Sequence, residues 1–393
     1  ALRQAREEGA GTVPPLARGC LSCDQTACFR HRPPLSVSQQ GRTAVLLDAW
    51  TPEFARYLGA HHADADRMQP VPLRLAFWRA RPATGWHREA AADGSASVQA
   101  PWWASLRRAV WQRLWARHAG RRQGSLIDGQ RWLALAFAAR LRPEHTQLVI
   151  DQALLPHLQQ IGALDGRRVT VLASALPMAE IERRLDAAAK RWPDDATLRD
   201  FRADAALVRA EAAALARAAM VVTPHADVAA HLAVLAPQAT SLRLDWVQPA
   251  ARTVAASSDA PPLIVFAASA LARKGARELA AALQGWPCRL RVLGSPSDDA
   301  QLWGGIGSVE YMHWRGDGLT GARVVVLPAH VEHAPRALLR ALAAGVPVVA
   351  TGACGLARLP GLREVAAGNV EGLREALKNA CAADDNKNIE SVS

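Results

Sequence analysis

The sequence predicts an α/β protein with two doubly wound domains, each built on a parallel sheet. Short apolar runs alternate with helical patterns along the chain, and this alternation is typical of βαβ units. It is interrupted at 247–262 by a stretch rich in Ala, Ser and Pro, which has the composition of an interdomain linker. A chain of 393 residues is long enough for two separate cores.

The first domain is expected to span 43–246. Its strands are predicted at 43–48, 73–77, 146–150, 168–172, 219–223 and 239–243. Its helices are predicted at 101–119, 129–142, 177–190, 197–217 and 224–235. Two such domains that face each other leave a cleft between the carboxyl ends of their strands, where ligands bind.

The second domain is expected to span 263–381. Its strands are predicted at 263–267, 289–293, 308–312, 323–327 and 346–350. Its helices are predicted at 273–284, 334–344 and 371–382. Two flanking segments fall outside both domains. Residues 1–42 form an extension rich in Pro, Gly, Arg and Cys, and the polar tail 382–393 is expected to be disordered.

The net charge of +11 indicates anionic partners, such as nucleotide phosphates, anionic lipid or nucleic acid. Nucleic acid is the weakest of these, because the arginines are spread along the chain and no RNA-binding motif accompanies them. No apolar run approaches the length of a membrane span, and the amino-terminal residues have no apolar core of a secretory signal. We therefore expect a cytoplasmic protein.

The segment 263–283 has the pattern of a phosphate site. A buried strand leads into a short loop, then Arg273, Lys274 and Gly275, and then a helix. Amides at a helix start attract phosphate oxygens, and adjacent cations add full charges. Gly275 allows the backbone to turn or to approach a ligand closely. The alternative is a basic residue beside an ordinary helix start.

A second segment, 324–356, places Glu332 and His333 in a loop between a strand and a helix. The carboxylate of Glu332 could accept hydrogen bonds from sugar hydroxyls there. The alternative is an acid at the start of a helix, which the helix dipole stabilises.

Taken together and in this order, the two segments resemble the retaining GT-B glycosyltransferases of the family that includes sucrose and trehalose-type synthases (glycosyltransferase family 4-like, glycosyl transferases group 1). The family pattern G-R-L-x-x-x-K-G corresponds to A-S-A-L-A-R-K-G here. The pattern E-G-F-G-x-P-x-x-E-A-x-A-x-G-x-P-V-V corresponds to E-H-A-P-R-A-L-L-R-A-L-A-A-G-V-P-V-V. The segment VVTPHADVAAHL at 221–232 resembles the last strand and helix of the family's first domain.

The resemblance implies the GT-B fold, with two facing Rossmann-like domains, and a nucleoside-diphosphate sugar held mainly by the second. Lys274 would neutralise the donor diphosphate and Glu332 would contact the donor sugar, and both count as catalytic candidates. No metal would be required for transfer if cations stabilise the leaving diphosphate. The implied donor-binding residues are Ser269, Arg273, Lys274, Gly275, Glu332, His333 and Arg340.

Four departures from the family pattern bear on activity. Its diphosphate arginine falls on Ser269, and Arg273 is the neighbouring substitute. Its second glutamate, which grips the ribose, is replaced by Arg340, which cannot accept a hydrogen bond. A histidine near the reacting centre is replaced by Ala173 and Ser174, and the glycine-rich acceptor loop by LLDAWTPEF.

Four polar residues at predicted strand ends are candidates for the acceptor side. They are Asp48, Asp151, Ser174 and His225. His225 ranks first among the histidines because it lies in a strand-to-helix loop on the interdomain side. The alternative for each is an ordinary surface or core residue.

The extension carries C-x2-C-x4-C-x2-H, formed by Cys20, Cys23, Cys28 and His31. Three thiolates and an imidazole at this spacing fit a structural Zn²⁺ site. The alternatives are an iron–sulfur cluster or free thiols.

Residues 101–123 form a basic, tryptophan-rich amphipathic helix with six arginines and no acid. Such a helix suits an anionic bilayer surface and would make the protein peripheral at the inner face of the cytoplasmic membrane. The alternative is a tryptophan stripe packed on the sheet, with solvated arginines.

The sequence therefore predicts an enzyme that moves a sugar, expected to be a hexose with retained configuration, from a nucleotide donor to a carbohydrate or lipid-linked acceptor. Cell-surface polysaccharide or glycoconjugate synthesis is the expected setting. The alternative is a non-catalytic relative of the same fold that acts as a binding or scaffold protein, which the departures at Ser269 and Arg340 favour.

Overall fold

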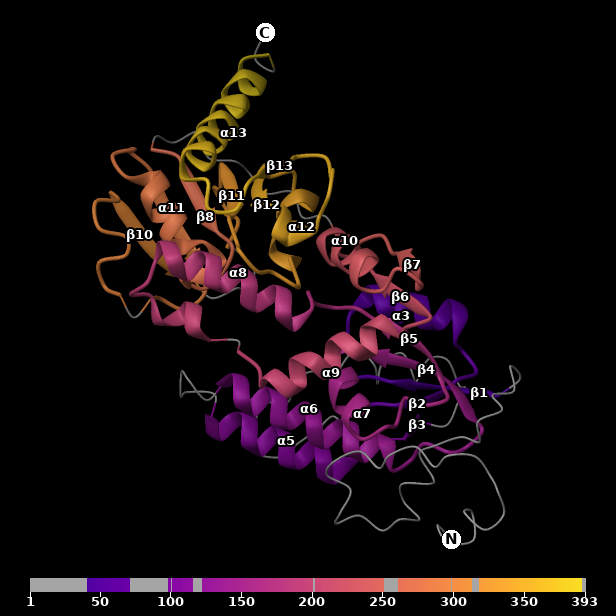
Figure 1. Ribbon diagram of the computed structural model, residues 1–393. Coiled ribbons are helices and arrows are strands. Elements are labelled where there is room, and N and C mark those ends of the chain that lie inside the picture. The colour runs from indigo at the N-terminus through magenta and orange to yellow at the C-terminus, as the bar shows by residue number, and fades with distance from the viewer. Residues whose placement is uncertain are drawn as a thin grey trace, which may run out of the picture.

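A computed structural model gives the structure of the chain. It describes residues 41–70, 98–99, 101–115, 122–200, 202–250, 261–297, 299–312 and 318–390. These residues form two α/β domains, one on each side of the segment 251–260 (Figure 1). The predicted two-domain architecture with parallel sheets is confirmed.

The first domain contains a seven-stranded parallel sheet of order β3-β2-β1-β4-β5-β6-β7. The strands are β1 (Arg42–Leu46), β2 (Asp66–Met68), β3 (Val98–Gln99), β4 (His145–Asp151), β5 (Arg168–Leu172), β6 (Met220–Thr223) and β7 (Thr240–Arg243). The helices are α3 (Pro52–His61), α5 (Trp102–Trp115), α6 (Arg122–Ala138), α7 (Leu155–Gln160), α8 (Met178–Arg191), α9 (Ala205–Ala216) and α10 (Ala226–Leu235).

Both faces of this sheet are buried, as a doubly wound sheet requires. Alternate residues of β1 point to opposite faces: Leu46 packs with α6, α7 and α9, whereas Val45 packs with α3. Helix α3 begins at Pro52 because the hydroxyl of Thr51 accepts a hydrogen bond from the amide of Phe54. This hydrogen bond fixes the residue at which α3 begins, shortly after the carboxyl end of β1.

The second domain contains a six-stranded parallel sheet of order β10-β9-β8-β11-β12-β13. The strands are β8 (Leu263–Phe266), β9 (Arg289–Leu293), β10 (Ser308–Met312), β11 (Val324–Leu327), β12 (Val348–Thr351) and β13 (Leu362–Val365). The helices are α11 (Ala276–Leu283), α12 (Arg336–Ala343) and α13 (Val370–Glu390). Strands β8, β11 and β12 are buried throughout and form the centre of one core.

The structure differs from the predicted elements mainly at sheet edges. Strands β2, β3 and β13 were not predicted, and the strand predicted at 73–77 lies outside the described residues. Helix α13 continues to Glu390, so helix occupies most of the tail that we expected to be disordered (Figure 1). The run 373–390 contains neither Gly nor Pro, so nothing in it terminates a helix.

The two domains meet through a small apolar cluster and several polar contacts. Leu185 and Ala188 of α8 pack with Ala272 and Val331 of the second domain. Figure 1 accordingly shows α8 lying beside that domain. The first domain thus reaches across the interface and contacts the loops that follow β8 and β11.

Candidate functional site

The candidate site lies where the strand order of the second sheet reverses. Strands β8 and β11 are neighbours in the sheet, although β9 and β10 come between them in the chain. The loops that follow these two strands therefore meet at one edge of the sheet, the place where doubly wound domains bind ligands. The loop after β8 carries Lys274 and the loop after β11 carries Glu332.

Gly275 shapes the first of these loops. The 3₁₀ turn η5 (Ala272–Lys274) ends at Gly275, whose φ of +80° belongs to the left-handed region. A Cβ atom at this position would lie 2.1 Å from the carbonyl oxygen of Pro328 in the second loop. The absence of a side chain therefore lets the two loops touch, which brings Lys274 over the neighbouring loop.

Lys274 and Glu332 form a largely buried ion pair. The Lys274 ammonium lies 2.7 Å from Oε2 of Glu332 and also donates to the carbonyl of Val331 at 3.3 Å. The other carboxylate oxygen, Oε1, accepts the amides of His333 and Ala334 at 2.8 and 2.9 Å. These two amides precede α12 at its amino-terminal end.

The charges of this pair follow from its surroundings. Burial raises the pKa of Glu332, but the charge of Lys274 and the donated hydrogen bonds outweigh it and lower that pKa to about 2. Burial lowers the pKa of Lys274, and the carboxylate of Glu332 opposes that change. Burial, helped by the charge of Lys274, also lowers the pKa of His333 to about 3, so its ring is neutral at pH 7.

The pair defines a site for an anion. One ammonium and two backbone amides converge on a carboxylate, which is the donor set that also binds phosphate oxygens. An ammonium has three N–H bonds, and two of those of Lys274 are used within the loops. The third has no hydrogen-bond acceptor among the residues that the structure describes. The buried Nε2 of His333 likewise has no partner among the described residues.

His225 is the first domain's contribution to this site. Its Nδ1 accepts the amide of Val228 and so caps α10, while its Nε2 donates to the backbone carbonyl of Glu332 at 2.9 Å. Burial lowers the pKa of His225, which keeps the ring neutral. We expected His225 on the acceptor side. The structure places its ring against the loop that carries Glu332, at the interface between the two domains.

The other residues that were predicted to bind the donor make separate contacts. The Ser269 hydroxyl accepts the amide of Ser295. The backbone carbonyl of Arg273 accepts the amide of His330 at 3.0 Å, which joins the two loops a second time. Arg340 is exposed on α12.

Of the three other acceptor-side candidates, the structure brings Asp48 and Asp151 together at the carboxyl ends of the neighbouring strands β1 and β4. Asp151 is buried and accepts the amides of Ala49 and Ala153, both at 3.2 Å. Burial and the charge of Asp48 raise the pKa of Asp151 to about 7. Asp48 pairs with Arg108 of α5. Ser174, half-buried, follows β5 at the same edge of the sheet.

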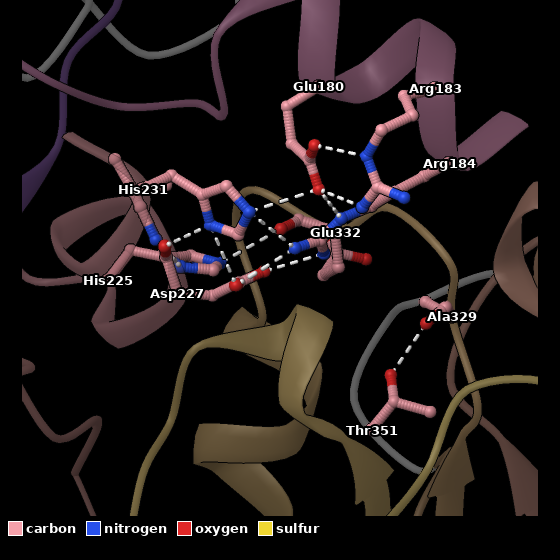
Figure 2. A network of polar contacts seen from close by, with 10 residues as sticks. Glu180, Arg183, Arg184, His225, Asp227, His231, Ala329, Glu332 and Thr351 are labelled. Atoms are coloured by element: carbon pink, nitrogen blue, oxygen red, sulfur yellow. Dashed lines mark hydrogen bonds and ion pairs between the residues drawn. The ribbon is translucent and has the colours of Figure 1, made fainter. Parts of the chain in front are cut away.

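A charged network beside the site was not predicted. Figure 2 shows Glu180, Arg183 and Arg184 of α8 facing Asp227 and His231 of α10, next to His225 and Glu332. Arg184 bonds both oxygens of Asp227, at 2.6 and 2.9 Å, and also Glu180. The spacing of Glu180, Arg183 and Arg184 is a visible signal for pairing along one helix. Nothing in the sequence signals the contact between the two helices.

Helix α5 exposes an apolar stripe. Residues at helical spacing point to solvent, namely Trp103 (67% exposed), Val110 and Leu114 (60% exposed). The helix packs on α6, and the guanidinium of Arg107 lies over the ring of Trp132 of that helix at 3.9 Å. The tryptophan stripe is therefore only partly packed against the domain. The predicted segment 116–121 lies outside the described residues.

The predicted metal ligands Cys20, Cys23, Cys28 and His31 lie outside the described residues. Within the described ranges, no group of three or more His, Cys, Asp or Glu side chains is arranged to hold a metal ion. The same part of the chain contains no helix long and apolar enough to cross a bilayer.

Residues 261–382 match the family model "Glycosyl transferases group 1". No curated protein matches the chain by sequence. Among solved structures, the chain is similar to sucrose-phosphate synthase from Thermosynechococcus elongatus, with 14% identity, a TM-score of 0.52 and coverage of 87% of this chain and 90% of that one. It is also similar to Anabaena HepE in complex with UDP and glucose (13%, TM-score 0.47, coverage 88% and 91%) and to the lipopolysaccharide outer core galactosyltransferase WaaB (11%, 0.49, 87% and 91%).

Proposed function

We propose that the protein transfers a sugar from a nucleoside-diphosphate sugar to a carbohydrate or lipid-linked acceptor. The support is that residues 261–382 match the model of the glycosyl transferases group 1 family and that the chain has the two-domain GT-B fold. The donor binds on the loops after β8 and β11, and the acceptor enters from the first domain. Retention of the anomeric configuration, in a hexosyl transfer, is part of this proposal, as is a role in surface polysaccharide or glycoconjugate synthesis.

The observation that carries the proposal is the anion site around Lys274. The ammonium and the amides of His333 and Ala334 already hold the carboxylate of Glu332 at the sheet edge where such domains bind ligands. A donor diphosphate next to Lys274 takes its remaining N–H bond. The leaving diphosphate gains charge during transfer, so a fixed cation there lowers the barrier.

Arg273 is the second cation of the proposed diphosphate site. It precedes Lys274 in η5, and the carbonyl of Arg273 is tied to the loop after β11. The Glu332 carboxylate, ionised and held in place, is the acceptor for hydroxyls of the donor sugar. No step of this scheme requires the predicted zinc or iron–sulfur centre.

A non-catalytic binding protein of the same fold is the second candidate. Two observations favour it: Lys274 and Glu332 are paired with each other, and Arg340 stands where the family has a ribose-binding glutamate. The two candidates share donor binding but differ in turnover. Release of nucleoside diphosphate from a nucleotide sugar, with and without an acceptor, separates them.

The donor site is tested by calorimetric titration with UDP, GDP, ADP and dTDP. We expect the wild type to bind at least one of them and Lys274→Ala to weaken that binding by about 10- to 150-fold, the value of a charge-assisted hydrogen bond. Lys378→Ala removes an exposed lysine from α13 of the same domain and serves as the control. Since Lys274→Ala leaves Glu332 buried without its cation, the double variant Lys274→Met, Glu332→Gln checks that the loss does not come from an isolated charge.

Equal nucleotide affinity in Lys274→Ala and the wild type contradicts the assignment of Lys274. A wild type that binds none of the four nucleotides, over a range that extends to millimolar concentration, contradicts donor binding altogether.

We further propose that α5 docks on an anionic membrane surface, which brings a lipid-linked acceptor to the first domain. The support is the outward stripe of Trp103, Val110 and Leu114, flanked by the exposed Arg107 and Arg113. Apolar side chains enter the boundary of the bilayer, and each arginine near an anionic surface contributes about 1 kcal/mol.

The docking proposal is tested by sedimentation with phosphatidylglycerol vesicles. The triple variant Trp103→Ser, Arg107→Gln, Arg113→Gln should lose vesicle binding and keep nucleotide binding. Arg108 is left intact because it pairs with Asp48 inside the domain. Binding that survives the triple change, or that does not weaken with salt, contradicts the proposal.

A further inference from the structure

We propose that His225 is a positioning residue, through which the first domain holds the donor-site loop of the second domain in its binding geometry. The proposal rests on the donor site proposed above. His225 does not reach the donor itself. It acts through the peptide bond between Glu332 and His333.

One peptide group connects His225 with the ion pair. Its carbonyl, from Glu332, accepts the Nε2–H of His225 at 2.9 Å. Its N–H, from His333, donates to Oε1 of the Glu332 carboxylate at 2.8 Å, and Oε2 of that carboxylate binds Lys274 at 2.7 Å. The hydrogen bonds therefore run in one series from α10 to the Lys274 ammonium (Figure 2 shows the His225 end). Bonds in series through a low-dielectric interior polarise and strengthen one another.

The direction of each bond is fixed by the chemistry of the ring. Nδ1 accepts the amide of Val228, so the proton of the neutral ring resides on Nε2, the atom that faces Glu332. Burial lowers the pKa of His225, and the charges that surround it are Asp227 and Arg184 from the first domain and Glu332 from the second. The ring therefore stays neutral, and keeps this tautomer, throughout the neutral range.

The ring has no freedom to leave this position. Gly355, which follows the turn η6 (Gly352–Cys354), packs on its edge, and a Cβ atom there would lie 2.0 Å from Nδ1. The carbonyl of Gly355 accepts two further donors from the first domain, the amide of Ala226 at 3.0 Å and the indole of Trp246 at 3.2 Å. His225 is thus seated between the two loops of the second domain that follow β11 and β12.

The consequence is that the geometry of the donor-site loop depends on the contact between the two domains. The amides of His333 and Ala334 and the carboxylate of Glu332 keep their arrangement only while α10 is docked. Separation of the domains frees the 332–333 peptide to rotate and loosens the ion pair. Donor affinity therefore depends on a residue that lies outside the family match at 261–382.

Two substitutions separate the two roles of His225. In His225→Asn, the short amide still caps α10 through the amide of Val228 but cannot reach Glu332. In His225→Gln, the longer amide places a donor where Nε2 stands and reaches the Glu332 carbonyl, at the expense of the cap. His231→Ala is the control on the same helix, because the polar partners of His231 among the described residues are Glu180, Arg184 and Asp227, all in the first domain.

The first measurement, amide hydrogen exchange without ligand, does not depend on the proposed function. Exchange at His333 and Ala334 should be about three- to tenfold faster in His225→Asn, as expected for the loss of one hydrogen bond. It should stay within about twofold of the wild type in His225→Gln and His231→Ala. The second measurement is UDP affinity, which should fall by the same factor in His225→Asn alone.

Unchanged exchange at His333 and Ala334 in His225→Asn overturns the inference, as does equal acceleration in His231→Ala. If the wild type binds UDP and His225→Asn binds it equally well, the inference is also overturned. If the wild type binds no UDP, the proposed donor site fails for this nucleotide, and the exchange measurement alone decides whether His225 positions the loop.

Discussion

Gly275→Ala is the sharpest test of how closely the loops after β8 and β11 approach each other. The substitution adds a single methyl group at a residue with φ of +80°, where a Cβ atom would stand 2.1 Å from the carbonyl oxygen of Pro328. The substitution is destabilising for two reasons: alanine disfavours a positive φ, and its Cβ atom clashes with the carbonyl oxygen of Pro328. Gly345→Ala is the matched change, since Gly345 lies in the same domain with φ of +77° and nothing within 4 Å of its added Cβ.

The expected magnitudes follow from these two environments. A left-handed conformation costs a non-glycine residue about 1–2 kcal/mol, and both variants incur this cost. Gly275→Ala also forces two backbone segments apart, and overpacking of this kind costs about 1–3 kcal/mol more. For a domain of this size, 1 kcal/mol lowers Tm by roughly 3–6 °C.

Differential scanning calorimetry of the two variants gives the comparison. The unfolding transition of Gly275→Ala should lie roughly 3–18 °C below that of Gly345→Ala, as the additional 1–3 kcal/mol requires. Nucleotide binding should be lost only in Gly275→Ala, because Gly345 lies in the turn before β12, at the opposite edge of the sheet from the site. Equal losses of stability in the two variants would refute the close approach of the two loops.

Three further perturbations test other parts of the structure. Gly59→Ala, at an exposed position inside α3 with open space around the added Cβ, should raise the free energy of unfolding by about 0.5–1 kcal/mol in urea titrations. Arg336→Ala should lower the free energy of unfolding by up to about 3–5 kcal/mol, because the buried Glu53 loses its cation. The double variant Glu53→Gln, Arg336→Met should recover most of this loss, because it leaves no buried charge without a partner. Folding lowers the pKa of Glu332 from 4.5 to about 2, so its ionised form stabilises the folded protein by about 3 kcal/mol above pH 4.5. This stabilisation is lost as the pH falls toward 2. In urea titrations, the difference in the free energy of unfolding between the wild type and Glu332→Gln should therefore shrink as the pH falls below 4.5.

The fold was predictable where strands are long and apolar. The predicted strands 263–267 and 323–327 cover β8 and β11, which are apolar and buried throughout. Strands β2 and β3 comprise three and two residues, and β2 reads Asp-Arg-Met. Such short strands form because they pair with a neighbouring strand, and pairing partners are not visible in a local pattern.

The sequence allows candidate site residues to be named one by one, but it does not show their contacts. Lys274 and Glu332 were identified from two separate loops, and the structure brings them into contact. That they bind each other depends on β8 and β11 being adjacent, with 57 residues between Lys274 and Glu332 in the chain. His225 was noticed for its place after β6, yet its partner is a backbone carbonyl, which any residue at 332 would present. A carbonyl has no sequence signal at all.

The loops of the second domain are contacted by the first domain, although the family match is confined to the second domain. Thr197 of the first domain accepts the amide of Ala272 at 3.2 Å, and Trp192 donates to the buried Glu278, which also receives His330. These contacts hold the loop of Lys274 from the side of α8, while His225 holds the loop of Glu332 from the side of α10. The first domain therefore contacts both loops of the proposed donor site, so we expect any separation of the two domains to relax these loops. Under the proposed function, donor affinity should then change together with domain closure, because both depend on the same contacts.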